Sequence, residues 1–147
     1  MSQIVDVTRK HKHEDRLKWD IYKTSHHCSY LSLGPDKGVD KTKPVENVRW
    51  LLEEQRQDGC ILVSSCKPIP VKYSEEDKDP QPPHRQAHNY YKEVADGRDG
   101  DIRITMEFPN KQKPKPTVVE ITGYGATLVK SLPAAASVVT GEPARAG

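Results

Sequence analysis

Alternation of apolar and polar side chains is clearest in two stretches of the chain. Leu17, Trp19 and Ile21 alternate with polar residues, and residues 102–108 show the same pattern. A period of two places every second side chain on one face of a strand, so both stretches are predicted to be half-buried β-strands. Further strands are predicted at residues 4–7, 29–33, 60–63 and 117–132, and residues 117–122 are expected to pair with residues 102–108 in a hairpin. Residues 67–73 are predicted to be an edge strand or an extended arm because they contain Pro68 and Pro70, so the total is about six or seven strands.

A different spacing precedes the apolar run at residues 60–63. Val45, Val48 and Leu52 recur at the spacing of one helical face, with Thr42 in position to cap and Pro44 in the first turn. The dipeptide Asp58-Gly59 is typical of a helix end. The main helix is therefore predicted at about residues 44–58, and a shorter one at residues 85–95.

The order of these elements favours an α+β fold with a mostly antiparallel sheet. The helices interrupt the predicted strands rather than alternating with them, which argues against a parallel doubly wound sheet. Residues 1–132 are predicted to form a single domain with an extended N-terminal arm and long loops. Residues 133–147 are small and alanine-rich. They are predicted to be a flexible or partner-bound tail.

The composition predicts a small hydrophobic core. Leu, Ile, Val and Phe make up about a fifth of the chain, close to the level at which disorder begins. Net charge is only +2, with 23 basic and 21 acidic residues, which argues for a folded chain. Such a core predicts extended arms held by other molecules, at residues 1–13, 67–83, 109–116 and 133–147.

Several classes of protein do not fit the sequence. No apolar run approaches the roughly 18 residues that a membrane span needs, so no membrane partner is expected. No basic region followed by an apolar block marks a secretory signal, so intracellular synthesis is expected. The odd number of cysteines, at positions 28, 60 and 66, favours reduced thiols over a disulfide framework.

One set of residues has the donor types of a zinc site. Cys60, Cys66, His84 and His88 combine two thiols with two imidazoles, and the histidines would share one helical face. The spacing departs from that of zinc fingers, and Cys60 and Cys66 would lie far apart along a strand. A small buried cysteine and surface histidines explain the same residues without a metal.

Two further groups of residues could carry function. His26, His27 and Cys28 form a second cluster of donors, but no protease signature surrounds the cysteine. Lys111, Lys113 and Lys115 lie between prolines in a loop that could follow a nucleic-acid backbone, with Tyr90-Tyr91 as stacking surfaces. A soluble hairpin tip explains the lysines equally well. The sequence assigns no catalytic residue and no cofactor site.

These features favour a non-enzymatic assembly subunit of a larger complex, either a viral particle or a multi-protein machine. Its expected partners are other protein subunits in a homo- or hetero-oligomer, and its expected location is the cytoplasm or a large assembly such as a virion. Basic ends and an acidic middle of the chain would suit contact between neighbouring subunits. The alternative is a small nucleic-acid-binding module, zinc-stabilised or not, that uses the loop of residues 111–115.

Overall fold

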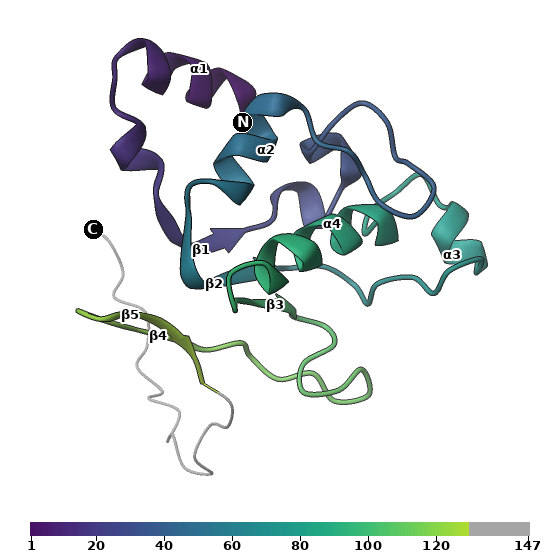
Figure 1. Ribbon diagram of the computed structural model, residues 1–147. Coiled ribbons are helices and arrows are strands. Elements are labelled where there is room, and N and C mark those ends of the chain that lie inside the picture. Colours follow the sequence, from purple (N-terminus) through teal and green to yellow (C-terminus); the bar gives the residue numbers. More distant parts are fainter. Residues whose placement is uncertain (130–147) are drawn as a thin grey trace, which may run out of the picture.

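The computed structural model describes residues 1–129, and its centre is a three-stranded parallel sheet in the order β1-β2-β3 (Figure 1). An antiparallel hairpin, β4–β5, forms a second sheet. The strands are β1 (Trp19–Lys23), β2 (Arg56–Ser64), β3 (Asp101–Ile104), β4 (Val119–Thr122) and β5 (Gly125–Leu128), and the α-helices are α1 (Ser2–Lys10), α2 (Glu46–Glu53), α3 (Glu75–Lys78) and α4 (Arg85–Asp96). The chain is therefore α+β, but the predicted antiparallel sheet of six or seven strands is wrong.

The three central strands are parallel because a helix lies between each strand and the next. Helix α2 connects β1 to β2, and α4 connects β2 to β3. A crossover of this kind returns the chain to the starting edge of the sheet, so that consecutive strands run in one direction. The prediction missed this order because it placed a strand at residues 29–33. The chain there forms a 3-10 turn, Tyr30–Ser32, in which Leu31 is exposed.

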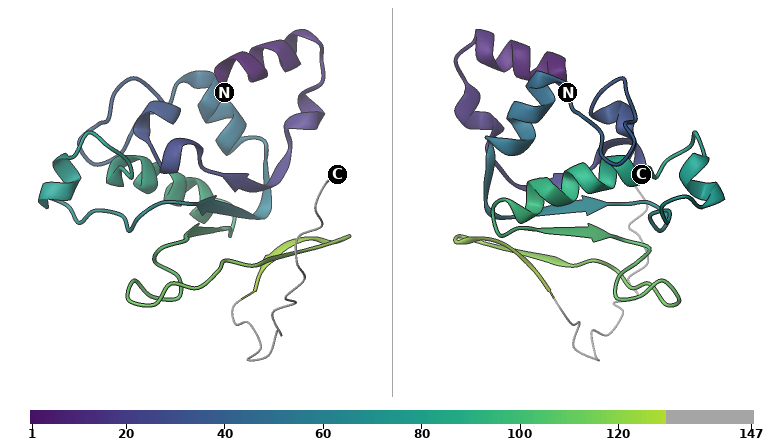
Figure 2. Two further views of the ribbon diagram at one scale, coloured as in Figure 1. Left: turned by 180° about the vertical axis from the view of Figure 1, so that it is seen from behind. Right: turned by 45° about the vertical axis from the view of Figure 1, so that its right-hand side comes forward.

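Three layers result from this topology. Helices α2 and α4 pack on one face of the sheet, and the β4–β5 hairpin lies against the other (Figure 2). Cys60 and Leu62 of β2 join the main core together with Leu52 of α2 and Tyr91 of α4. Ile61, between them in the strand, is also buried. Coverage on both faces explains why this strand is a continuous apolar run rather than an alternating one.

The predicted helix at residues 44–58 is shorter than expected. Helix α2 ends at Glu53 and β2 begins at Arg56, so Asp58-Gly59 lies inside a strand. Gly59 has a φ of 71°, and the register of β1 on β2 shifts beside it. This is a bulge, in which glycine accommodates a left-handed backbone at no steric cost. The same dipeptide suits a helix end and a bulge, which explains the error.

The predicted pairing of residues 102–108 with 117–122 is also wrong. Strand β3 stops at Ile104 and pairs with β2, whereas β4 pairs with β5 across the turn at Gly123 and Tyr124. A turn follows β3 at residues 105–107. The alternating sequence pattern at residues 102–108 therefore extends beyond the end of the strand.

The N-terminal segment is not an extended arm. Residues 2–10 form α1, which packs on α2, and Val5 is fully buried there. The guanidinium of Arg9 lies 4.0 Å from the centroid of the Trp50 ring, and its Nη1 donates to Asn47 Oδ1 over 3.1 Å. The strand predicted at residues 4–7 is therefore wrong, since these residues belong to α1. Helical spacing buries Val5 while Ile4 and Val7 stay exposed, whereas in a strand Val5 and Val7 would share one face.

The other predicted arms have different outcomes. Residues 67–83 dock on the body of the molecule, where Arg85 Nε pairs with Asp77 at 3.2 Å and Lys72 Nζ with Asp40 at 2.6 Å. Ile69 in this segment packs against the core. Residues 109–116 form an exposed loop, and their contact with other molecules stays a prediction. The tail at residues 133–147 lies outside the described residues.

Candidate ligand-binding cavity

The carboxyl ends of the three parallel strands open into a cavity of about 640 Å³. We call it the carboxyl-edge cavity, and it is lined by His27, Ser65, Cys66, Lys67, Gln81, Pro82, Thr105 and Met106. His27 follows β1, residues 65–67 follow β2, and Thr105 and Met106 follow β3 directly. Gln81 and Pro82 come from the loop before α4. The edge where strands end is the usual place for ligands in open sheets with helical crossovers.

A strained turn forms one wall of this cavity. His26, His27 and Cys28 all have left-handed backbone conformations, with φ of 47°, 55° and 67°. Each costs an L-residue roughly 1–2 kcal/mol, and runs of such residues are rare. His27 Nδ1 donates to the carbonyl oxygen of Ser65 over 2.5 Å. A carbonyl only accepts, so this bond places the ring hydrogen on Nδ1 and leaves Nε2 available to a ligand.

One cysteine, Cys66, lines the cavity, and a second, Cys28, is buried near it. The Ser64 hydroxyl donates to Cys66 Sγ over 3.1 Å. Burial raises the pKa of the Cys66 thiol, and this hydrogen bond only partly offsets the effect. Burial also raises the pKa of the Cys28 thiol, and the neighbouring Cys66 adds to the shift. Both cysteines are therefore neutral thiols at physiological pH, which are poor nucleophiles.

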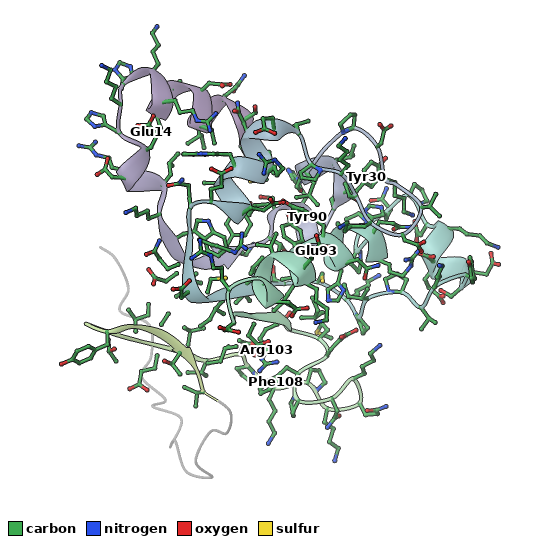
Figure 3. The ribbon with its side chains drawn as sticks, in the orientation of Figure 1. Glu14, Tyr30, Tyr90, Glu93, Arg103 and Phe108 are labelled. Atoms are coloured by element: carbon green, nitrogen blue, oxygen red, sulfur yellow. The ribbon has the colours of Figure 1, made fainter. Side chains whose placement is uncertain are left out.

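His84, at the start of α4, holds two loops of this edge together. Its Nε2 donates to the Pro80 carbonyl over 3.2 Å, and its Nδ1 accepts from the Tyr30 amide over 3.4 Å. The Tyr30 ring, labelled in Figure 3, meets the imidazole edge-on with centroids 4.9 Å apart. His84 is buried, and burial lowers its pKa, with Lys37 acting in the same direction. The loop before α4 is thereby fixed to the turn that follows β1.

The segment after β3 is tied to the segment after β2. Glu107 Oε1 accepts from the Ile69 amide over 2.8 Å and pairs with Lys111 Nζ at 3.2 Å. Arg103 lies 5.0 Å from the centroid of the Phe108 ring, and Figure 3 shows the two side chains together beside β3. Because the hydrogen bond between Ile69 and Glu107 joins the two segments, the walls of the cavity are cross-linked rather than independent.

The charge around the cavity is one-sided. None of its eight lining residues is acidic, whereas Lys67 is a cation and His27 a basic imidazole. Lys67 is exposed and makes no ion pair within residues 1–129. Two carboxylates near the wall segments are already engaged, since Glu107 accepts from Ile69 and pairs with Lys111, and Asp79 Oδ1 accepts from the Gln81 amide. The cavity therefore offers cationic and hydroxyl donors beside the apolar surfaces of Pro82 and Met106.

The structure does not bring the predicted zinc ligands together. Within residues 1–129 no three His, Cys, Asp or Glu side chains gather in a way that could hold a metal ion. Cys60 is packed at the start of β3, where a Cβ on Gly100 would come within 2.8 Å of its Sγ. Cys66 lies beyond the opposite end of β2, and His84 and His88 belong to the first turn of α4. The two cysteines and the pair of histidines therefore do not converge on one point.

The residues predicted to bind nucleic acid differ in their exposure. Lys111, Lys113 and Lys115 lie in the exposed loop after β3, and Lys111 is paired with Glu107. Tyr90 and Tyr91 are both buried, so they offer no stacking surface. The hydroxyl of Tyr90 donates instead to Glu53 Oε1 over 2.9 Å. Nucleic-acid binding by the lysine loop stays a prediction, without its aromatic component.

Sequence reasoning missed most of the cavity. Ser65, Gln81 and Thr105 stand in no motif, and they meet only because three parallel strands end at one edge. The positional signal in the sequence was weak, since Ser65 comes two residues after the predicted strand at 60–63, whereas Thr105 was placed inside the predicted strand at 102–108. The cluster at residues 26–28 was noticed for its donor atoms but not for its backbone.

No helix in the described part of the chain has both the length and the apolar character needed to cross a membrane. Comparison of the sequence with protein-family models and curated proteins, and of the structure with solved structures, found no match.

Proposed function

We propose that this protein is a binding domain for a small molecule, and that the carboxyl-edge cavity is its binding site. The observation that carries the proposal is convergence, because residues following all three parallel strands line one cavity. Its volume of about 640 Å³ suits an organic molecule of ordinary size. Pockets at the carboxyl edge of such sheets receive ligands in unrelated proteins of this architecture.

The strained turn at residues 26–28 supports the proposal. Strain of this kind persists only where the surrounding structure over-determines the backbone, and it concentrates at functional sites. Here the hydrogen bond from His27 to Ser65 and the complete burial of Cys28 hold the turn in place. The turn thus fixes His27 at the cavity before any ligand arrives, which lowers the entropic cost of binding.

The chemistry of the cavity favours binding over catalysis. Cys66 is the most nucleophilic residue type in the lining, and its thiol is held neutral by burial. Covalent catalysis by cysteine needs a thiolate and a base that is positioned to generate it. The only hydrogen bond described for Cys66 Sγ comes from Ser64, which is not a base. The proposed activity is therefore recognition without bond-making.

The proposal can be tested by filling the cavity. A fragment library is screened by thermal shift against the natural protein, Thr105→Trp and Thr127→Trp. Thr105 lines the cavity, whereas Thr127 is exposed on β5 and provides a control of the same residue type. We expect compounds that stabilise the natural protein to lose their effect in Thr105→Trp and to keep it in Thr127→Trp. Equal effects in both variants, or no stabilising compound, would contradict the proposal.

A second candidate function is that of an assembly subunit in a homo- or hetero-oligomer. It is supported by large apolar side chains left exposed on one side of α1, where Ile4 and Val7 are 61% and 58% accessible. Ile4 and Val7 are one helical turn apart and therefore lie on the same side of α1. Exposed apolar side chains that gather on one face of a protein often mark a surface for contact with another protein.

The assembly function predicts a mass in solution above that of the 16.6 kDa chain. We expect light scattering to show this larger mass for the natural protein, and the monomer mass for Ile4→Glu/Val7→Glu. Val39→Glu, at another exposed valine, is the matched control and should leave the mass unchanged. A monomer at every concentration, with or without its native neighbours, would count against this function.

A further inference from the structure

The residues that line the carboxyl-edge cavity also indicate which class of ligand it binds. This inference rests on the proposed function. Three kinds of group surround the space: a cation, a hydrogen-bond acceptor and apolar surface. Lys67 supplies the cation, His27 the acceptor, and Pro82 and Met106 the apolar surface. Each of these groups constrains a different part of the ligand.

The cation requires a negative charge on the ligand. Lys67 has no ion-pair partner in the described chain, and no carboxylate lines the cavity. Other lysines of this region are already engaged, since Lys72 pairs with Asp40 and Lys111 with Glu107. An anionic group that reaches Lys67 therefore meets an uncompensated ammonium and no competing anion in the lining.

The imidazole requires a donor on the ligand. His27 uses Nδ1–H to donate to the Ser65 carbonyl, which leaves Nε2 as an acceptor in the neutral ring. A bare carboxylate has no hydrogen to offer this nitrogen, whereas a hydroxyl or ammonium beside the charge does. The side chains of Ser65 and Thr105 can donate as well as accept, so they add no further restriction.

We infer that the carboxyl-edge cavity binds a small organic oxyanion that carries a hydroxyl or N–H donor next to its charge and an apolar body. The oxyanion contacts Lys67, the donor contacts His27 Nε2, and the body packs on Pro82 and Met106. Hydroxy acids, amino acids and phosphate monoesters in their singly protonated form share this chemistry. The left-handed turn at residues 26–28 holds the acceptor in position on this wall.

Three probes separate these requirements, and calorimetry at pH 8 measures their affinities. Mandelate has the charge, the hydroxyl and the phenyl ring; phenylacetate lacks the hydroxyl, and mandelamide lacks the charge. We expect mandelate to bind about tenfold more tightly than mandelamide, as for a charged hydrogen bond, and three- to tenfold more tightly than phenylacetate, as for a neutral one. Phenyl phosphate, measured at pH 6 and pH 8, distinguishes a phosphate source from a carboxylate source of the same chemistry.

Two substitutions assign these preferences to residues. Lys67→Gln should abolish the preference for mandelate over mandelamide, and Lys113→Gln, on the exposed loop, should retain it. His27→Asn tolerates the left-handed backbone and should abolish the preference over phenylacetate. Equal binding of mandelate and mandelamide, or preferences that survive both substitutions, would overturn the inference.

The outcome also separates this inference from the proposed function. If neutral fragments occupy the cavity and are displaced by Thr105→Trp while mandelate does not bind, the ligand class is wrong and the binding site stands. If neither these probes nor any fragment binds, both are wrong.

Discussion

Two hollows of nearly equal volume lie on this protein, and their walls are built in different ways. The carboxyl-edge cavity encloses about 640 Å³, and the other, which we call the hairpin hollow, about 630 Å³. The hairpin hollow lies between the start of β1 and the turn of the β4–β5 hairpin, and it is lined by Lys18, Trp19, Asp20, Ile21 and residues 121–126. Volume alone does not distinguish them.

The difference lies in what holds each wall. Hydrogen bonds from His27 to Ser65 and from Ile69 to Glu107 join the segments that surround the carboxyl-edge cavity. One wall of the hairpin hollow is a two-stranded hairpin, a unit that is marginally stable by itself. At that wall Ile121 is 74% exposed and Tyr124 is fully exposed. A binding site needs walls that are fixed before the ligand arrives, and only one hollow has them.

The largest expected effect is a difference in stability between a substitution in the central sheet and one in the hairpin. Leu62 is fully buried in β2 and belongs to the main core, so Leu62→Ala should lower the free energy of unfolding by about 2–5 kcal/mol. Ile121→Ala removes an exposed side chain on the hairpin and should change it by less than about 0.5 kcal/mol. Urea unfolding of both variants measures the difference. Similar losses in the two variants would mean that the hairpin is as well anchored as the sheet.

The next effect concerns pH and the loop fixed by His84. Because burial lowers the pKa of His84 below its ordinary value of 6.5, the folded protein binds fewer protons than the unfolded chain at mildly acidic pH. This contribution to stability is complete above pH 6.5 and is lost as the pH falls toward the lowered pKa. Burial lowers the pKa of His88 in the same way.

The urea midpoint should therefore fall between pH 7.5 and pH 5. His84→Gln should reduce that fall, because one of the two histidines with a lowered pKa is gone. His13→Gln, at an exposed position outside this edge, should leave it unchanged. A fall of the same size in all three proteins would show that His84 does not link this edge to pH.

The smallest effect tests the strain in the turn. His26 has a φ of 47°, so His26→Gly should stabilise the protein by about 1 kcal/mol, as relief of a left-handed residue predicts. Lys23→Gly, in the extended backbone of β1, should destabilise it by about 0.5–1 kcal/mol. If His26→Gly also destabilised the protein, the turn would not be strained.

The sequence predicted individual elements better than their arrangement. The alternation at Trp19 and Ile21 lies in β1, and the helix expected at residues 85–95 is α4. The parallel direction of the strands was not predicted, because the 3-10 turn at Tyr30 has the same apolar residues as a short strand. The small core misled in another way, since it suggested arms where α1 buries Val5 on its own body.

The cavity was beyond sequence reasoning for a topological reason. Its lining comes from segments between residues 27 and 106, which meet only once the strands are known to be parallel. The left-handed backbone of His27 and Cys28 was equally hidden, because neither residue type favours that conformation as glycine does. Tertiary contacts impose it, and no local pattern records them.

The most direct test of the binding site is an amide-resolved NMR titration of the full chain with a compound that stabilises it. We predict that the amides of Ser65, Lys67, Thr105 and Met106 shift together along one binding curve, while those of residues 121–126 stay in place. Shifts concentrated at residues 121–126, with the amides of the carboxyl-edge cavity unchanged, would contradict the assignment and place the site in the hairpin hollow.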